Sequence, residues 1–295
     1  MRIDQLPRSD RIEDRRGVRM RRGGIGLGTL IIVGLIAWAL GINPLLLIGG
    51  LEGLTGGQSQ PPPQSDTART QTSGGASDQM KEFVSAVLGS AEVQWTELFA
   101  QANARYQAPT LVMFSGATQS ACGFAQSAMG PFYCPLDRKV YLDTSFFEDM
   151  RRRFGACDAG KACEFSQAYV IAHEIGHHVQ NLLGILPRLQ QMQRGMDRGE
   201  ANRLQVMAEL QADCFAGIWA NRSQQKWKFL DPGDVEAALQ TASAIGDDRI
   251  QRRSQGYVVP DAFTHGSSRQ RVRWFTIGLK SGDVASCDTF SAQQL

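Results

Sequence analysis

Three of the four histidines in this chain of 295 residues lie within the stretch I-A-H-E-I-G-H-H-V-Q, positions 171–180, where His173, Glu174 and His177 form the pattern H-E-x-x-H. On an α-helix, residues four apart lie one above the other, so the two imidazoles can hold one metal ion with a carboxylate beside them. Zinc bound in this way activates a water molecule, and the glutamate takes its proton. A chance match is the alternative, but a composition with four histidines gives this spacing rarely. The stretch therefore predicts a helix that carries one Zn²⁺ ion.

A hydrolytic zinc site usually has a third protein ligand and leaves a fourth position for water. His178 is a poor candidate, because it is five residues from His173 and lies on a different part of the helix surface; we expect it to be packed or hydrogen-bonded. The segment A-E-L-Q-A-D-C-F-A-G places Glu209 and Asp213 on one helical face. We predict that Glu209 is the third ligand and that Asp213 accepts the second N–H of a ligating histidine. The alternative, a solvated acidic face, fits poorly with the apolar residues of this segment.

The fourth histidine, His265, precedes a predicted helix in the stretch D-A-F-T-H-G-S-S-R-Q-R-V. During amide hydrolysis a negative charge develops on the substrate oxygen, and a positioned donor stabilises it. His265 is a candidate for that donor, with Arg269 or Arg271 holding it in place or adding positive charge. A surface histidine without a functional role is the alternative.

Sparse strands followed by many helices predict a mainly helical α+β domain with a small sheet. Apolar residues at helical spacing predict helices at 80–88, 90–104, 145–154, 167–183, 198–221, 233–245 and 267–280. Ser166 is the expected N-cap of the helix that carries the histidines. Short apolar runs predict strands at 111–114 and 139–143. Between them, the prolines of G-P-F-Y-C-P restrict residues 130–135 to a sheet edge or a loop.

The first 79 residues differ in composition from the rest. Residues 1–22 carry eight arginines against four acids and are predicted to be a basic, disordered tail. Residues 23–51 contain no charge and are long enough for a transmembrane anchor, with a cleaved signal peptide or a buried core helix as alternatives. Residues 52–79 are polar and rich in Gly and Pro, which predicts a flexible linker to a domain at residues 80–295. Arginines before the span predict a cytoplasmic N-terminus and an extracytoplasmic, periplasmic domain.

All six cysteines lie in this predicted domain, and an even number in an exported domain indicates disulfides. If the cysteines closest in sequence form two disulfides, Cys214 and Cys287 remain; they would pair with each other or stay as buried thiols. Those two pairs are Cys122 with Cys134 and Cys157 with Cys163. No cysteine has the C-x-x-C spacing of a structural zinc site. The net charge of +2 and the pI near 8.2 give no reason to expect a nucleic-acid partner.

The motifs in combination resemble the bacterial family of neutral zinc metallopeptidases. They are, in chain order, G-P-F-Y-C-P with V-Y-L-D, H-E-I-G-H-H-V-Q, E-L-Q-A-D-C-F-A-G and D-A-F-T-H-G-S-S-R-Q-R-V-R-W-F. The resemblance also covers the N-terminal R-x-R-R-G-G-I-G-L-G-T-L. It implies a zincin fold of the gluzincin kind, in which a glutamate on the next helix is the third ligand, as Glu209 would be.

The same resemblance implies roles for His265 and Arg271. The segment T-H-G-S-S-R-Q-R is similar to a threonine-histidine-proline segment with a following arginine in membrane-associated gluzincins, although Gly266 replaces the proline here. In zincins an edge strand pairs with the extended backbone of the substrate, and residues 130–134 are a candidate for such an edge, with a plain loop as the alternative.

The sequence as a whole predicts a membrane-anchored zinc metallopeptidase that acts on a peptide or protein substrate with Glu174 as general base. Two other functions stay open. One is a non-catalytic module that binds cell-envelope proteins and uses zinc for stability. The other is a zinc hydrolase of a non-peptide amide. The oligomeric state is not predicted.

Overall fold

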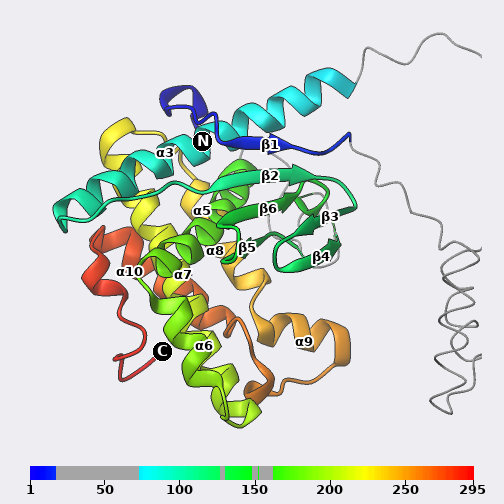
Figure 1. Ribbon diagram of the computed structural model, residues 1–295, viewed down its shortest axis with the longest axis vertical. Coiled ribbons are helices and arrows are strands. Elements are labelled where there is room, and N and C mark those ends of the chain that lie inside the picture. The colour runs from blue at the N-terminus through cyan, green and yellow to red at the C-terminus, as the bar shows by residue number, and fades with distance from the viewer. Residues whose placement is uncertain (18–72, 127–129, 148–151, 153–161) are drawn as a thin grey trace, which may run out of the picture. The chain divides into compact units, whose positions relative to one another are not determined.

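The computed structural model describes residues 1–17, 73–126, 130–147, 152 and 162–295. These residues form a set of packed helices with a small sheet beside them (Figure 1). The predicted α+β class, mainly helical with a small sheet, is therefore confirmed.

The main sheet has four strands in the order β1-β2-β6-β5. β2 (Thr110–Phe114) and β6 (Lys139–Asp143) match the two predicted strands; they pair in parallel and are buried beyond their first residues. β5 (Phe132–Cys134) pairs antiparallel with β6 and is an edge strand, one of the two places that its flanking prolines allow. β1 (Ile12–Asp14) is parallel to β2 at the other edge.

A second, two-stranded sheet has no counterpart among the predicted strands. β3 (Ala117–Ser120) and β4 (Gly123–Gln126) form an antiparallel hairpin directly after β2. Cys122 in its turn forms a disulfide with Cys134 of β5, which confirms that predicted pair. The bond ties the hairpin to the edge strand.

Several helices are longer than predicted, and two have no predicted counterpart. Their bounds are α3 (Ser73–Gln101), α5 (Ala162–Leu182), α6 (Ile185–Gln193), α7 (Arg198–Trp227), α8 (Asp234–Ala244), α9 (Asp247–Gln255) and α10 (Ser268–Ser281), with short 3₁₀ helices η1 (Ile3–Gln5), η3 (Pro260–Ala262) and η4 (Val284–Cys287). α3 replaces two predicted helices and begins inside the predicted linker at 52–79. α6 and α9 have no predicted counterpart, and the helix expected at 145–154 lies largely outside the described residues.

Helix starts follow their capping residues where a cap exists. α7 begins as predicted, because the Asp197 carboxylate accepts hydrogen bonds from the backbone N–H groups of Gly199 and Glu200 at 2.8 and 3.0 Å. By contrast, Ser166 is not the N-cap of α5. It lies inside this helix and is fully buried.

α5 and α7 cross closely at Gly176, which lies between His173 and His177. A Cβ atom on this residue would lie 3.0 Å from the carbonyl oxygen and 3.1 Å from the Cα of Ala212, closer than side chains normally approach. Glycine therefore lets α7 come near enough for the residues on either side of Ala212 to reach α5.

Residues 1–17 belong to the same compact unit as the helices, so the prediction of a free basic tail is wrong for them. Met1 and Leu6 are only 5% and 4% exposed, and β1 adds its backbone to the sheet. The segment crosses α3 at Gly89, where a Cβ would clash with the backbone of residues 7–9. The composition alone predicts disorder, because it suggests that the entropy cost of ordering the segment exceeds the gain from burial. In the folded chain, burial of apolar side chains and backbone pairing with β2 offset that cost.

The arginines of this segment pair with acidic side chains. Arg15 bonds Glu13 at 2.7 Å, and Arg16 bonds Asp14 at 2.5 Å. Arg8 reaches across to Glu82 of α3 at 2.5 Å. The basic stretch is therefore largely neutralised by its own acids and by the helix beneath it, which a count of charges does not reveal.

No helix among the described residues is both long and apolar enough to cross a membrane. The predicted anchor at 23–51 lies outside these residues. β1 and β2 share a sheet, so residues 1–17 and the helical domain lie on the same side of any membrane. A single crossing at 23–51 would place them on opposite sides, and the sheet is not compatible with that predicted topology.

A second described disulfide joins Cys214 of α7 to Cys287 of η4, so these two cysteines are not free thiols. Cys163 is also disulfide-bonded. Its predicted partner, Cys157, lies outside the described residues.

Candidate metal centre

Three side chains from α5 and α7 converge on one point. His173 and His177 project from successive turns of α5, and Glu209 projects from α7. Glu209 Oε2 lies 3.2 Å from His173 Nε2 and 3.5 Å from His177 Nε2. One ligand atom from each residue lies within 4.8 Å of the others. The structure thus brings together the three residues predicted as ligands.

These distances fit a zinc ion. Ligand atoms on a tetrahedral zinc with bonds of about 2.0–2.1 Å lie about 3.3–3.4 Å apart. The two measured oxygen-to-nitrogen distances fall on either side of that value. Two imidazole nitrogens and one carboxylate oxygen also form a donor set that zinc accepts, and three protein ligands leave one tetrahedral position for water.

The other ring nitrogen of His173 is held by a buried carboxylate. Its Nδ1 lies 2.9 Å from Asp213 Oδ1, as predicted for Asp213. Asp213 accepts two further hydrogen bonds from Arg271, both at 2.8 Å, and one from the Tyr169 hydroxyl at 2.5 Å. Burial alone would raise the pKa of Asp213, but the charge of Arg271 and the hydrogen bonds from Arg271 and His173 hold that pKa well below its usual range. Asp213 is therefore a charged acceptor that orients His173.

Arg271 is not where the sequence suggested. The sequence predicts it beside His265, but its guanidinium bonds Asp213 and Tyr169 and is 4% exposed. The reason is geometric: Arg271 is on the first turn of α10, which packs on α7 beside Asp213. Its side chain supports the carboxylate behind His173.

His177 has a different partner behind it. Its Nδ1 lies 2.9 Å from the side-chain oxygen of Gln180, which is fully buried. Both candidate ligand histidines therefore have Nδ1 occupied on the protein side and Nε2 directed at the point where the three side chains converge.

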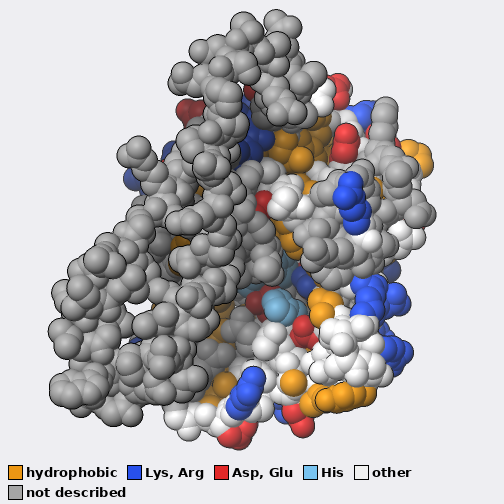
Figure 2. Space-filling view, turned by 90° about the vertical axis from the view of Figure 1, so that its right-hand side faces the viewer, with side chains coloured by type: hydrophobic (Ala, Val, Ile, Leu, Met, Phe, Trp, Pro, Cys, Tyr) orange, Lys and Arg blue, Asp and Glu red, His pale blue; other side chains and the backbone are white. Residues whose placement is uncertain are grey.

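The metal centre opens into a cleft of about 380 Å³. Glu174 lines this cleft next to the histidines and is 7% exposed. Figure 2 shows histidine and acidic side chains together in a hollow of this face of the molecule. Residues of β5 and the proline before it line one part of the cleft, and residues of α6 line another; they include Pro131, Phe132, Tyr133, Leu186, Leu189 and Gln190. The cleft therefore gives an extended ligand access to the metal centre.

His265 lines the same cleft, on the loop between η3 and α10. Asp247, the first residue of α9, holds this loop. Its Oδ2 accepts the backbone N–H groups of Thr264, His265 and Gly266 at 2.7, 2.6 and 3.1 Å, and its Oδ1 lies 3.3 Å from His265 Nδ1. The hydrogen bond to Asp247 raises the pKa of His265 above its ordinary value, which favours a protonated, donating imidazole.

His178 has the packed and hydrogen-bonded role predicted for it. Its Nε2 donates to the carbonyl of Gln107 at 2.6 Å, and its Nδ1 accepts from the Tyr133 hydroxyl at 3.0 Å. Burial lowers the pKa of His178 to about 4, so the ring is neutral at physiological pH. Asn181 also donates to the Tyr133 hydroxyl, at 2.9 Å. The C-terminal half of α5 thus fixes edge strand β5 beside the metal centre.

Sequence reasoning missed three residues of the site. Tyr169 lies one turn before His173, and Gln180 lies three residues after His177, so helical spacing could have indicated both. Asp247 had no such signal, because it reaches His265 across eighteen residues in a separate helix.

The fold and the site define a class: a mainly helical α+β protein with a two-histidine, one-glutamate metal centre. A family model described as "Putative neutral zinc metallopeptidase" matches residues 1–290, and the chain belongs to this family. It is 46% identical over 293 residues to "Uncharacterized protein YpfJ" of Escherichia coli K12, covering 96% of each chain. It is 40% identical over 242 residues to an uncharacterised protein of Mycobacterium bovis, covering 79% of this chain and 78% of that protein. No solved structure matches the chain.

Proposed function

We propose that the protein is a zinc-dependent peptidase. The observation that carries this proposal is the convergence of His173, His177 and Glu209 at zinc-ligand spacing, with Glu174 beside them in an open cleft. A structural zinc site needs neither a neighbouring carboxylate nor access to solvent. The family description supports zinc and peptide hydrolysis.

Zinc bound to these ligands would lower the pKa of a water molecule to roughly 7 and polarise the carbonyl of the scissile bond. Glu174, which lines the cleft beside the two histidines, would take a proton from the attacking water and pass it to the leaving amine. His265 faces the cleft with a raised pKa and can donate to the oxygen that becomes negative. Asp213 and Gln180 keep the two histidines in the orientation that directs Nε2 at the ion.

The substrate is proposed to be an extended peptide. β5 pairs with β6 on one side only, so its other edge can bond the backbone of a peptide lying in the cleft. Phe132 and Tyr133 of this strand line the cleft, and Leu186 and Leu189 of α6 line it as well. The cleft therefore offers backbone hydrogen bonds along one strand and apolar contacts from α6.

We also propose that residues 23–51, which carry no charge, attach the protein to a membrane without carrying the chain across it, because residues 1–17 and the domain share one sheet. The disulfides favour an oxidising, extracytoplasmic location for the domain, and residues 1–17 share its side. Two variants, Gln5→Cys and Arg253→Cys, each add one exposed cysteine and test in spheroplasts whether residues 1–17 and the domain lie on the same outer side of the membrane. An impermeant maleimide should label both without permeabilisation, and labelling of one alone would overturn the proposed placement.

The test of function compares wild type with Glu174→Gln on a diverse peptide library. The purified full-length chain should cleave peptides with zinc and stop when a chelator is added. Glu174→Gln should bind zinc as wild type does but lose activity by about 10²–10⁴-fold, because the proton acceptor is gone. Glu200→Gln, an exposed change on α7, is the matched control and should be fully active.

Each contrary result points to a different function. Stoichiometric zinc without cleavage of any peptide would favour the non-catalytic binding module. Chelator-sensitive cleavage of a non-peptide amide alone would favour that class of hydrolase. Full activity in Glu174→Gln would remove this residue from the mechanism.

A further inference from the structure

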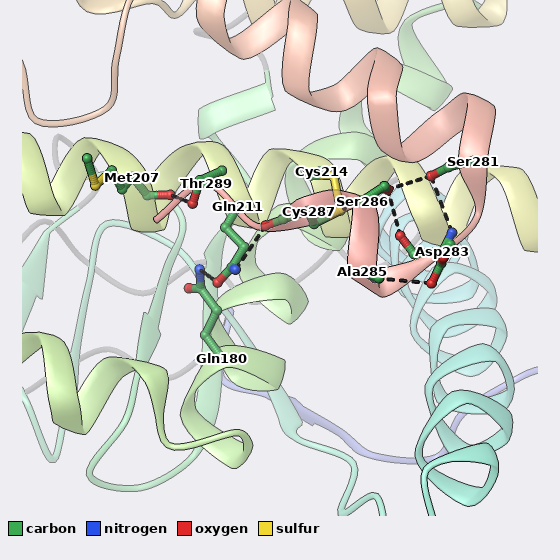
Figure 3. The surroundings of a disulfide bond; sticks show 10 residues. All are labelled: Gln180, Met207, Gln211, Cys214, Ser281, Asp283, Ala285, Ser286, Cys287 and Thr289. Carbon is green, nitrogen blue, oxygen red and sulfur yellow. Dashed lines mark hydrogen bonds between the residues drawn. A yellow bond between two sulfur atoms is a disulfide. The ribbon is translucent and has the colours of Figure 1, made fainter. Parts of the chain in front are cut away.

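The last described helix of the chain is fixed against the helix that carries Glu209. Cys287 of η4 forms the disulfide with Cys214 of α7, and both are fully buried (Figure 3). Just beyond it, the Thr289 hydroxyl donates to the carbonyl of Met207 at 2.7 Å. The backbone carbonyl of Cys287 is therefore held at a defined place beside α7, between two anchoring contacts.

Two buried glutamines connect this carbonyl to the metal centre. The amide nitrogen of Gln211 donates to the Cys287 carbonyl at 3.0 Å. The amide nitrogen of Gln180 donates to the Gln211 side-chain oxygen at 3.0 Å and to the Ala208 carbonyl at 2.7 Å. The side-chain oxygen of Gln180 lies 2.9 Å from His177 Nδ1. Gln180 is fully buried and Gln211 is 6% exposed, so water does not compete for these contacts.

The direction of this chain of hydrogen bonds is set at its protein end. A backbone carbonyl only accepts hydrogen bonds, so the side-chain nitrogen of Gln211 must face the carbonyl of Cys287. For the same reason, the side-chain nitrogen of Gln180 must face the carbonyl of Ala208. Each carboxamide must then point its oxygen toward the metal centre. The oxygen of Gln180 can only accept, so His177 must carry its proton on Nδ1 and leave the lone pair of Nε2 for the ion.

We propose that Gln180 and Gln211 are positioning residues that impose the zinc-binding tautomer of His177, with the disulfide-held carbonyl of Cys287 as their fixed reference point. The inference rests on the proposed zinc site but not on catalysis. It gives His177 a supporting partner of a different chemical kind from the carboxylate behind His173. A neutral amide, unlike a carboxylate, needs its own donors and acceptors satisfied, and Ala208, Gln211 and Cys287 supply them.

The test measures zinc affinity by competition with a chromophoric chelator, together with the thermal stability of the zinc-free full-length protein. Gln180→Leu removes the acceptor for His177, and loss of such a partner typically weakens metal binding about 10–100-fold. Gln211→Leu should weaken it less, because the Ala208 carbonyl still orients Gln180. Gln94→Leu, the same change at a buried glutamine of α3, is the matched control and should leave zinc affinity unchanged.

Gln180→Glu separates positioning from general packing. A carboxylate still accepts the Nδ1 proton of His177, so zinc affinity should stay close to wild type. Its second oxygen would face two acceptors, the Ala208 carbonyl and the Gln211 oxygen, so the zinc-free protein should melt at a lower temperature. A purely structural role for Gln180 would instead lower affinity in both variants in proportion to their lost stability.

Three outcomes would overturn the proposal: Gln180→Leu binding zinc within twofold of wild type, equal loss in Gln94→Leu, or a wild-type chain that binds no zinc. Failure of the proposed function has a different signature, namely wild-type protein that binds zinc with the predicted affinity pattern but cleaves no peptide.

Discussion

We predict that Asp213 is the position of the metal centre most sensitive to substitution after the three candidate ligands. Its two oxygens accept hydrogen bonds from four donor atoms, one on His173, one on Tyr169 and two on Arg271. The carboxylate is 0% exposed and Arg271 is 4% exposed. Asp213→Asn would turn an amide N–H group toward these donors and leave a buried guanidinium without its counter-charge.

The expected cost follows from that geometry. Removing one partner of a buried ion pair destabilises a protein by about 3–5 kcal/mol. At roughly 2–4 °C per kcal/mol for a domain of this size, the melting temperature of Asp213→Asn should fall by about 6–20 °C. Zinc affinity should also fall by about 10–100-fold, because His173 loses the acceptor that orients it.

Differential scanning calorimetry and zinc competition on the full-length chain measure the two effects. Asp261→Asn, an exposed change of the same kind, is the control. Arg271→Met should cost less in the Asp213→Asn background than in wild type, because the two groups compensate each other. The reasoning is refuted if Asp213→Asn melts and binds zinc as wild type does.

Two further predictions concern parts of the fold that support the site. The folded-state pKa of His178, about 4, lies below the unfolded value near 6.5, so the unfolded chain binds the extra proton between these two values. The folded state therefore loses stability as the pH is lowered from about 6.5 toward 4. Urea unfolding of the zinc-free protein should show about 2 kcal/mol less stability at pH 5 than at pH 7.5 from this residue, a slope that His178→Gln should lack; equal slopes would contradict the assignment. Leu6→Ala should cost about 2–5 kcal/mol in urea unfolding, since Leu6 is 4% exposed, whereas Leu136→Ala, 75% exposed, should cost almost nothing. Equal costs would show that the N-terminal segment does not pack on the domain in solution.

The ligand set could be predicted from the sequence because it depends on local periodicity. His173 and His177 are one helical turn apart, as are Glu209 and Asp213, so each pair had to share a face wherever a helix formed. Only the meeting of the two helices had to be assumed. Gly176, between the histidines, is the residue that permits their close approach.

The partners that connect distant segments could not be predicted in the same way. Arg271 reaches Asp213 across 58 residues, and its direction depends on how α10 packs on α7. Asp247 and the loop of His265 also meet only in the folded chain. Helical spacing predicts on which side of its helix a residue lies, but it does not predict which other element packs against that side.

The N-terminal segment shows a different limit. Its arginine content suggests a solvated tail, yet β1 pairs with β2 and Leu6 enters the core. Composition averages over the few apolar residues that determine packing, and it does not distinguish free charges from charges paired with neighbouring acids.

X-ray absorption at the zinc edge, on the full-length wild-type protein and on Glu209→Gln, tests the metal centre most directly. We predict one zinc per chain with two imidazole nitrogens and otherwise oxygen ligands at about 2.0–2.2 Å, and reduced zinc occupancy in Glu209→Gln. A sulfur ligand at about 2.3 Å, or zinc bound equally well without Glu209, would contradict the convergence of α5 and α7 on a hydrolytic zinc site.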